Sequence, residues 1–231
     1  MEYLEFEQIL SAKRIQRYKD AANGDTRKAM ALYRYNLRLS QEMFTIVSCF
    51  EVALRNAIDS LLVPSLGEDW LKDSVQDNGI FSNGRMNETR KIIEKAYNRL
   101  NRQGNYSHSK LIAEMEFGVW KYMYSSLQYR ATGQCLLRAF PNKPRSSAAV
   151  QYNNTYIFNE LDKVNSLRNR IAHHEPICFR LHEAEIDTSY IINEYQKIQT
   201  LFSWMGIDSH SMLYGLDHVQ SVCAKINSLK V

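Results

Sequence analysis

The stretch SQEMFTIVSCFEVALRNAIDSLL, residues 40–62, indicates what kind of fold this chain adopts. Its apolar residues recur three and four positions apart, which places them on one face of an α-helix. Ser40 is suited to cap the N-terminus of that helix, and Pro64 lies just past its expected end. The stretch therefore predicts an amphipathic helix that buries one stripe of side chains in a core.

The same helical spacing continues on both sides of this stretch. Further helices are expected over residues 4–22, 26–39, 85–102, 109–130, 156–172, 183–204 and 209–229. Residues 67–84 and 140–147, the second with a Pro-Asn-Lys-Pro segment, are expected to be loops. Strand-like alternation is scarce, so the predicted fold class is all-α, a helical bundle in which residues 1–231 form one domain.

The composition narrows the class of protein. Of the 231 residues, 45% are hydrophobic and 23% are charged, as in soluble globular proteins, and the net charge of +4 suits an acidic partner such as RNA. The four cysteines are far apart, which favours a reducing cytoplasm over a zinc site or a disulfide framework. We expect a cytoplasmic protein with no membrane partner, because the acidic N-terminus is unlike a signal peptide and no apolar run approaches the roughly 20 residues of a membrane span.

Reactive side chains concentrate in the segment LRNRIAHHEP, residues 167–176. Histidine can give or take a proton near neutral pH, and the arginine guanidinium matches a phosphate group. Cleaving a phosphodiester without a metal needs both kinds of group close together. The segment therefore predicts a phosphodiester site. The structural alternative is an ordinary arginine ion pair followed by a histidine that caps a helix.

Arg168 occupies an unusual place on the helix that leads into this segment. The apolar stripe of that helix consists of Ile157, Leu161, Val164, Leu167 and Ile171. At about 100° per residue, Arg168 falls beside the stripe, between Val164 and Ile171. An arginine there is costly unless it is paired, lies at the rim of the core, or faces an interface.

The polar residues of the segment fall into two pairs four positions apart. Asn169 and His173 share the face opposite the stripe and can hydrogen-bond, and Arg170 and His174 are related in the same way. Pro176 disfavours helix at the residue before it, so both histidines are expected in the last helical turn.

The pattern Arg168-Asn169-x-x-x-His173 resembles the Arg-x(4 to 6)-His signature of the HEPN superfamily, helical proteins that include many metal-independent RNases. Its Asn-containing form is similar to that of type VI CRISPR effector nucleases. Residues 167–176, together with EVALRNAI at 51–58 and EFGVW at 116–120, resemble bacterial abortive-infection proteins of the Abi-like, AbiD/AbiF type. The resemblance implies a HEPN-type bundle with additional helices.

The resemblance also implies an activity, RNA cleavage by transesterification without a metal or another cofactor, in phage defence or as a toxin. His173 would act as general base or acid, Arg168 would stabilise the transition state, and Asn169 would orient His173 or the phosphate. His174 fits the broader signature and remains a rival for the catalytic role. One motif per chain implies a homodimer with a composite active site, and an antitoxin or a noncoding RNA is a possible further partner.

Two other groups of charged residues are candidates for contact with RNA. Glu51 and Arg55 either border the catalytic cleft, as the resemblance implies, or form a surface ladder with Asp59. A basic stripe either follows an RNA backbone or is a solvated helix face, and it consists of Lys91, Lys95, Arg99 and Arg102. Two alternatives to catalysis remain: a non-catalytic RNA-binding or scaffold protein that holds phosphate with the same motif, and a purely structural helical dimer.

Overall fold

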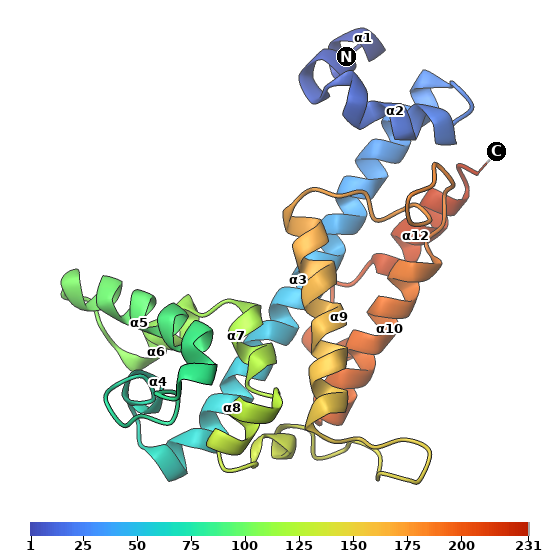
Figure 1. Ribbon diagram of the computed structural model, residues 1–231. Helices are drawn as coiled ribbons and strands as arrows, with labels where there is room; N and C mark the ends of the chain where they lie inside the picture. Colours follow the sequence, from blue (N-terminus) through green and yellow to red (C-terminus); the bar gives the residue numbers. More distant parts are fainter. Residues whose placement is uncertain (231) are drawn as a thin grey trace. The chain divides into compact units, whose positions relative to one another are not determined.

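The computed structural model describes residues 1–230, which form α-helices and no β-strand, so the predicted all-α class is confirmed. Two short 3-10 helices, η1 (Gly84–Met86) and η2 (Leu136–Ala139), interrupt the loops. The α-helices, labelled where there is room in Figure 1, are α1 (Tyr3–Leu10), α2 (Ala12–Ala21), α3 (Thr26–Leu66), α4 (Trp70–Asp73), α5 (Asn87–Arg102), α6 (His108–Glu114), α7 (Phe117–Tyr122), α8 (Ser126–Ala131), α9 (Asn154–Ala172), α10 (Ser189–Trp204), α11 (Ser209–Met212) and α12 (Val219–Asn227).

The chain divides into two compact units. Unit 1 comprises Met1–Ser48, Ser166–Thr200 and the chain from Asp208 onward, whereas unit 2 comprises Cys49–Asn165 and Leu201–Ile207. Helices α3, α9 and α10 contribute residues to both units. The expectation of a single domain over the whole chain remains a prediction.

Helix α3 corrects the sequence prediction at Ser40. The two helices expected over residues 26–39 and 40–62 are one helix, and Ser40 lies in its interior rather than at an N-cap. Leu39 and Met43 are both fully buried, so the apolar stripe continues through Ser40 without a break. A serine caps a helix only where the chain enters from an extended conformation, which does not occur here. Pro64 is also inside α3, within its last turn.

Three predicted helices are broken where the backbone leaves the helical region. Ser11, with a φ of 72°, separates α1 from α2, and Gly215, with a φ of 74°, lies between α11 and α12. Residues 109–130 form α6, α7 and α8 instead of one helix, because Glu116 and Ser125 are extended. Extended or left-handed residues break the i to i+4 hydrogen-bond pattern that a continuous helix requires.

The segment 67–84, expected to be a loop, contains the short helix α4. Trp70 and Leu71 of α4 are buried, and the Trp70 indole N–H donates a 2.7 Å hydrogen bond to Asp59. Helices α4, α5 and α6 pack against one another within unit 2. Burial of two large side chains thus orders a segment whose own sequence has no helical periodicity. The other expected loop, residues 140–147, has neither helix nor strand.

Each unit has an aromatic contact network in its core. In unit 1, the Tyr18 ring lies 5.2 Å from that of Tyr33 and 5.0 Å from that of Phe179. In unit 2, the Phe50 ring lies 5.2 Å from that of Phe202 in an edge-to-face arrangement. Edge-to-face pairs add about 0.5–1.5 kcal/mol to the effect of burial.

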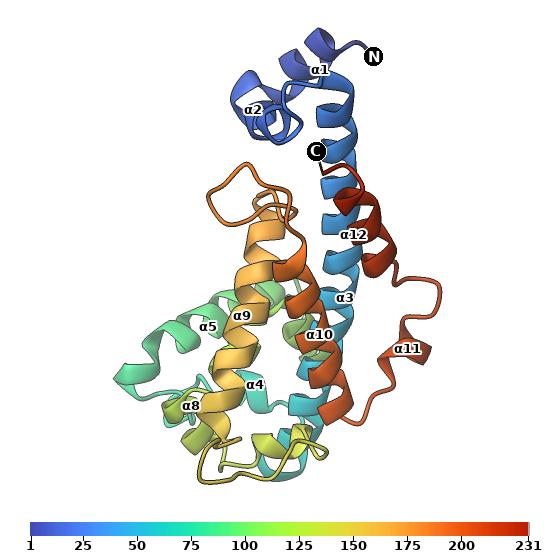
Figure 2. The ribbon, with the colours of Figure 1, turned by 90° about the vertical axis from the view of Figure 1, so that its right-hand side faces the viewer.

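The chain that follows α9 is held in place by side chains of unit 1. The buried Asn36 of α3 accepts hydrogen bonds from the backbone amides of Ile177 and Cys178, at 2.9 and 3.2 Å. Arg17 of α2 donates to the carbonyl oxygens of Arg180 and Glu183, and this loop is visible beside α2 in Figure 2. The end of α9 is therefore anchored by contacts that come from α2 and α3.

Among residues 1–230, no helix combines the length and the apolar character that crossing a bilayer would require. All four cysteines are free thiols. Burial raises the pKa of Cys178 to about 12, so this thiol near the end of α9 stays protonated and is a poor nucleophile.

Candidate functional site

Helix α9 carries the candidate site at its C-terminal end, within unit 1. The predicted apolar stripe is confirmed, since its five members from Ile157 to Ile171 are at most 7% exposed. Arg168 is half-buried beside this stripe, while Asn169 and His173 are exposed. The helix thus places a cation at the edge of a core and two polar side chains in solvent.

The two histidines differ in what their backbones do. Helix α9 ends at Ala172, so both histidines lie in the turn after the helix rather than in its last turn. His174 has a φ of 56°, its amide donates to the Ile171 carbonyl at 2.9 Å, and the Glu175 amide donates to the Arg170 carbonyl at 2.9 Å. This pair of bonds is a Schellman motif, in which the left-handed residue is usually glycine. His174 therefore closes the helix.

Arg170 has a structural role in the same turn. Its Nε donates to a carboxylate oxygen of Glu175 at 3.3 Å, and its Nη2 donates to the Pro176 carbonyl at 3.1 Å. Its guanidinium also lies 5.0 Å from the centre of the Tyr190 ring. The predicted pairing of Arg170 with His174 is wrong, because the left-handed turn at His174 takes that side chain off the helical face.

The other three candidates lack internal partners. Among residues 1–230, no hydrogen bond or ion pair involves the side chain of Arg168, Asn169 or His173. Asn169 and His173 are joined only through the backbone, by the His173 amide and the Asn169 carbonyl at 2.9 Å. The Arg168 nitrogens are not among the buried side-chain atoms that lack a partner, so the guanidinium stays open to solvent or to a ligand. Ion pairing and side-chain capping therefore account for none of the three.

Arg14 is a neighbour of this site that the sequence pattern missed. Its Nη1 donates to the His174 carbonyl at 3.4 Å, although the two residues are 160 positions apart. Arg14 is exposed and has no carboxylate partner among residues 1–230. It follows Lys13 in α2 and precedes Arg17, and this basic run is the one signal in the sequence that could have drawn attention to it.

Glu51 and Arg55 belong to unit 2, so the cleft-lining role implied for them stays a prediction. Both are half-buried, and the Nε atom of Arg55 is buried without a hydrogen-bond partner. Asp59, the third member of the expected ladder, instead accepts hydrogen bonds from Trp70 Nε1 and His108 Nε2, each at 2.7 Å. Asp59 is therefore a packing residue rather than part of a surface ladder.

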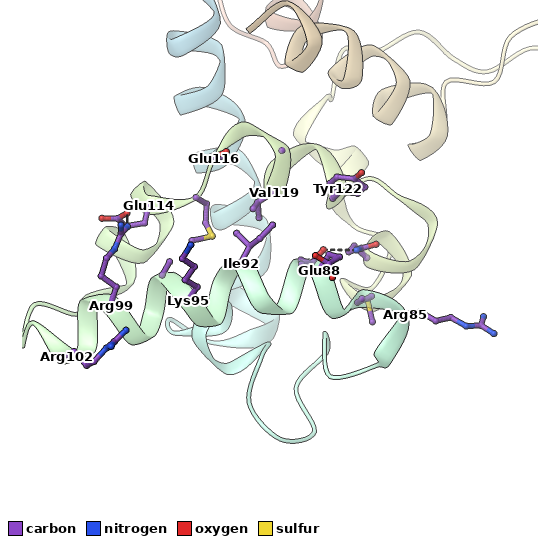
Figure 3. A pocket seen from close by; sticks show the side chains of 16 residues that line it. Arg85, Glu88, Ile92, Lys95, Arg99, Arg102, Glu114, Glu116, Val119 and Tyr122 are labelled. Atoms are coloured by element: carbon purple, nitrogen blue, oxygen red, sulfur yellow. Dashed lines mark hydrogen bonds and ion pairs between the residues drawn. The ribbon is translucent and has the colours of Figure 1, made fainter. Parts of the chain in front are cut away.

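The predicted basic stripe lies on α5, also in unit 2. Lys91 pairs with Glu88 at 3.2 Å, and Arg99 pairs with Glu114 of α6. Lys95 forms no ion pair among residues 1–230, and Arg102 donates to the Asn98 carbonyl of its own helix at 3.2 Å. Lys95, Arg99 and Arg102 line one groove, shown in Figure 3, whereas Lys91 does not.

No group of three or more His, Cys, Asp or Glu side chains among residues 1–230 is arranged to hold a metal ion. The carboxylates of Asp208 and Asp217, near the C-terminus, are hydrogen-bonded to groups of the protein itself. Asp208 accepts hydrogen bonds from the amides of His210 and Ser211, and Asp217 accepts one from the Tyr195 hydroxyl at 2.7 Å.

Comparison with known proteins gives one clear relationship. No curated protein and no solved structure matches the chain. The family model for Abi-like protein matches residues 3–178, well over half of the 231 residues, and this range includes the segment at the end of α9. Membership of this family suggests a role in abortive infection. The chain therefore belongs to the Abi-like protein family.

Proposed function

We propose that this Abi-like protein is a metal-independent endoribonuclease of HEPN type, with its active residues at the end of α9. The observation that carries the proposal is that Arg168, Asn169 and His173 lie within six residues at the C-terminal end of α9 and have no internal partners among residues 1–230. Polar groups that face solvent and have no partner within the protein are available for a ligand. A proton-transfer group beside a permanent cation suits a phosphodiester.

The proposed reaction is a transesterification. The ribose 2′-oxygen attacks the adjacent phosphorus, the bond from phosphorus to the 5′-oxygen breaks, and the products are a 2′,3′-cyclic phosphate and a free 5′-hydroxyl. His173 accepts the 2′-hydroxyl proton or gives a proton to the leaving oxygen. Arg168 stabilises the extra negative charge of the transition state, and Asn169 orients His173 or the phosphate.

A second copy of the chain supplies the other half of the site in this proposal. Attack and departure occur on opposite sides of the phosphorus, so the reaction uses one base and one acid, whereas each chain has one such motif. The exposure of Asn169 and His173 leaves them accessible to a symmetry-related copy. An interface would also give the half-buried Arg168 an acceptor.

Incubation of purified protein with mixed RNA in EDTA tests the activity. The wild type should produce fragments that end in 2′,3′-cyclic phosphate, and His173→Ala should not. Folded His174→Gly is the matched control and should cleave, because glycine keeps the turn that His174 forms. Absence of EDTA-resistant cleavage by the wild type, or equal cleavage by His173→Ala, would contradict the proposal.

A non-catalytic RNA-binding or scaffold protein is the second candidate function. One observation favours it: among residues 1–230 no side chain fixes the orientation of the His173 ring, as a general base would require. If this function is the right one, His173→Ala leaves RNA affinity unchanged, while charge reversal at Lys91, Lys95 and Arg99 weakens it. A gel-shift titration at low salt separates the two functions.

The proposed role in cells is phage defence or toxicity, held in check by an antitoxin or a noncoding RNA. Induction of the wild type from a tightly repressed promoter should stop growth, and induction of His173→Ala should not. Equal growth of both strains, with equal protein levels on a blot, would argue against a toxic nuclease.

A further inference from the structure

Unit 2 contains a groove that the proposed RNase chemistry does not use. It has a volume of about 720 Å³ and runs along α5, with Met115, Glu116 and α7 on its other side. Figure 3 shows Ile92 and Lys95 of α5 pointing toward this other side, where Val119 and Tyr122 lie.

The floor of the groove is apolar and mostly aliphatic. Met86, Ala96, Met115 and Val119 line it and are buried, whereas Ile92 is 48% exposed. Tyr122 at one end is 47% exposed. Exposed apolar side chains beside a concave apolar surface are typical of a place where another molecule binds. Methionines in such a surface adapt their shape to the side chains of a partner.

The unpaired charges that line the groove are mostly positive. Arg99 is neutralised by Glu114, and Glu88 by Lys91. Among residues 1–230, the lining side chains without an ion-pair partner are the cations Arg85, Lys95 and Arg102 and one anion, Glu116. Arg85 points away from the groove in Figure 3, which leaves Lys95, directed toward Met115, and Arg102, at the far end of α5, as its cations without an ion-pair partner among residues 1–230. An occupant with an apolar face and acidic flanks would complement this arrangement.

We propose that this groove binds an acidic amphipathic helix of a partner protein. The α5 residues that line the groove run from Glu88 to Arg102, so at 1.5 Å per residue its wall is about 21 Å long. Apolar side chains of that helix contact Ile92 and Met115, and its acidic side chains pair with Lys95 and Arg102. The proposal does not depend on RNase activity.

An RNA strand fits the same groove less well. Single-stranded RNA binds by stacking its bases on aromatic faces, and among residues 1–230 Tyr122 is the one aromatic residue that lines this groove. The Lys121 ammonium lies 4.6 Å from the centre of the Tyr122 ring, and the Phe158 ring lies 5.7 Å away. Part of the Tyr122 ring is therefore already in contact with the protein, and the remaining floor suits aliphatic side chains.

Fluorescence anisotropy with three labelled probes tests the proposal on the full chain. The first probe is a synthetic helix of about 16 residues with leucines on one face and glutamates on both flanks. The second has lysines in place of the glutamates, and the third is a single-stranded RNA of about 12 nucleotides. We expect saturable binding of the acidic helix below about 100 µM, at least about tenfold tighter than the basic helix. Failure of the acidic helix to saturate would overturn the proposal.

Surface substitutions assign the binding to this groove. Lys95→Glu should weaken the acidic helix about tenfold, and Ile92→Ser should weaken it by a similar factor through loss of apolar contact. The control Lys110→Glu makes the same charge change at an exposed position of α6 outside the groove, and we expect an effect within about threefold because salt screens the separated charges. Equal loss in Lys95→Glu and Lys110→Glu would show that the groove is not the binding site, and RNA binding abolished by Ile92→Ser would make RNA its occupant.

Discussion

Replacement of His174 by glycine should stabilise the protein, although the residue lies in the candidate site. His174 is held at a φ of 56°, a conformation that only glycine adopts without steric strain. The two hydrogen bonds of this turn, from the His174 and Glu175 amides, involve backbone atoms alone and persist in the variant. The substitution therefore removes strain without removing a contact of the turn.

The magnitude follows from two opposing terms. A left-handed conformation costs a residue with a Cβ about 1–2 kcal/mol, which glycine avoids. Glycine in turn loses about 0.5–1 kcal/mol more conformational entropy when the chain folds. At the midpoints of the two ranges the difference is a gain of about 0.75 kcal/mol, which for a chain of this size raises Tm by about 1.5–3 °C.

His173→Gly is the matched comparison. His173 keeps a negative φ, so glycine relieves no strain there and should lower the stability by about 0.5–1 kcal/mol. Thermal unfolding followed by far-UV circular dichroism should rank the proteins as His174→Gly, wild type, His173→Gly from highest to lowest Tm. A lower Tm for His174→Gly than for the wild type would refute the assignment of His174 as the closing residue of α9.

Three further predictions concern contacts of unit 1. Arg14→Gln should lower kcat/KM for RNA cleavage about tenfold at unchanged Tm, because it removes a cation beside His174, while Lys13→Gln should not. Glu42→Leu should cost about 3 kcal/mol in urea unfolding and Glu42→Gln less, because this buried carboxylate accepts from Arg38 and from the His218 amide. Burial, then the hydrogen bond to Asp217, raises the pKa of Tyr195 from 10.0 to about 12, so its contribution to stability is complete below pH 10 and is lost as the pH rises toward 12. Tm measured against pH should fall less between pH 10 and 12 in Tyr195→Phe than in the wild type, and the fall that remains reflects other tyrosines with a raised pKa, such as Tyr106.

Helix positions were predictable wherever the apolar period was long. The stripe of α9 was predicted correctly from Ile157 to Ile171, because each of its members is one turn from the next and all are buried. The division of residues 109–130 into three helices was not predictable in this way. Glu116 is an ordinary helix residue by composition, and its extended conformation accompanies the burial of Phe117 in a core, whereas Ser125 is of a type that favours the N-cap position it occupies before α8.

The sequence predicted which segment of the chain holds the candidate site, but not which other residues lie around it. Arg168 and Asn169 lie at the end of α9 and His173 directly follows it, so spacing along the chain alone places the three close together. Whether Arg168 had an ion-pair partner depended on residues elsewhere in the chain. The proximity of Arg14 to His174 spans 160 positions, and no local pattern encodes it.

The sequence by itself determined that the chain is helical and that one helix end holds an arginine, an asparagine and two histidines, because these features depend on periodicity and spacing within a few turns. The tertiary structure decided the different roles of the two histidines, the lack of partners for Arg168, the position of Arg14 and the groove beside α5. These properties arise from contacts between segments far apart in the chain. Such contacts form when buried side chains pack, and local spacing does not record them.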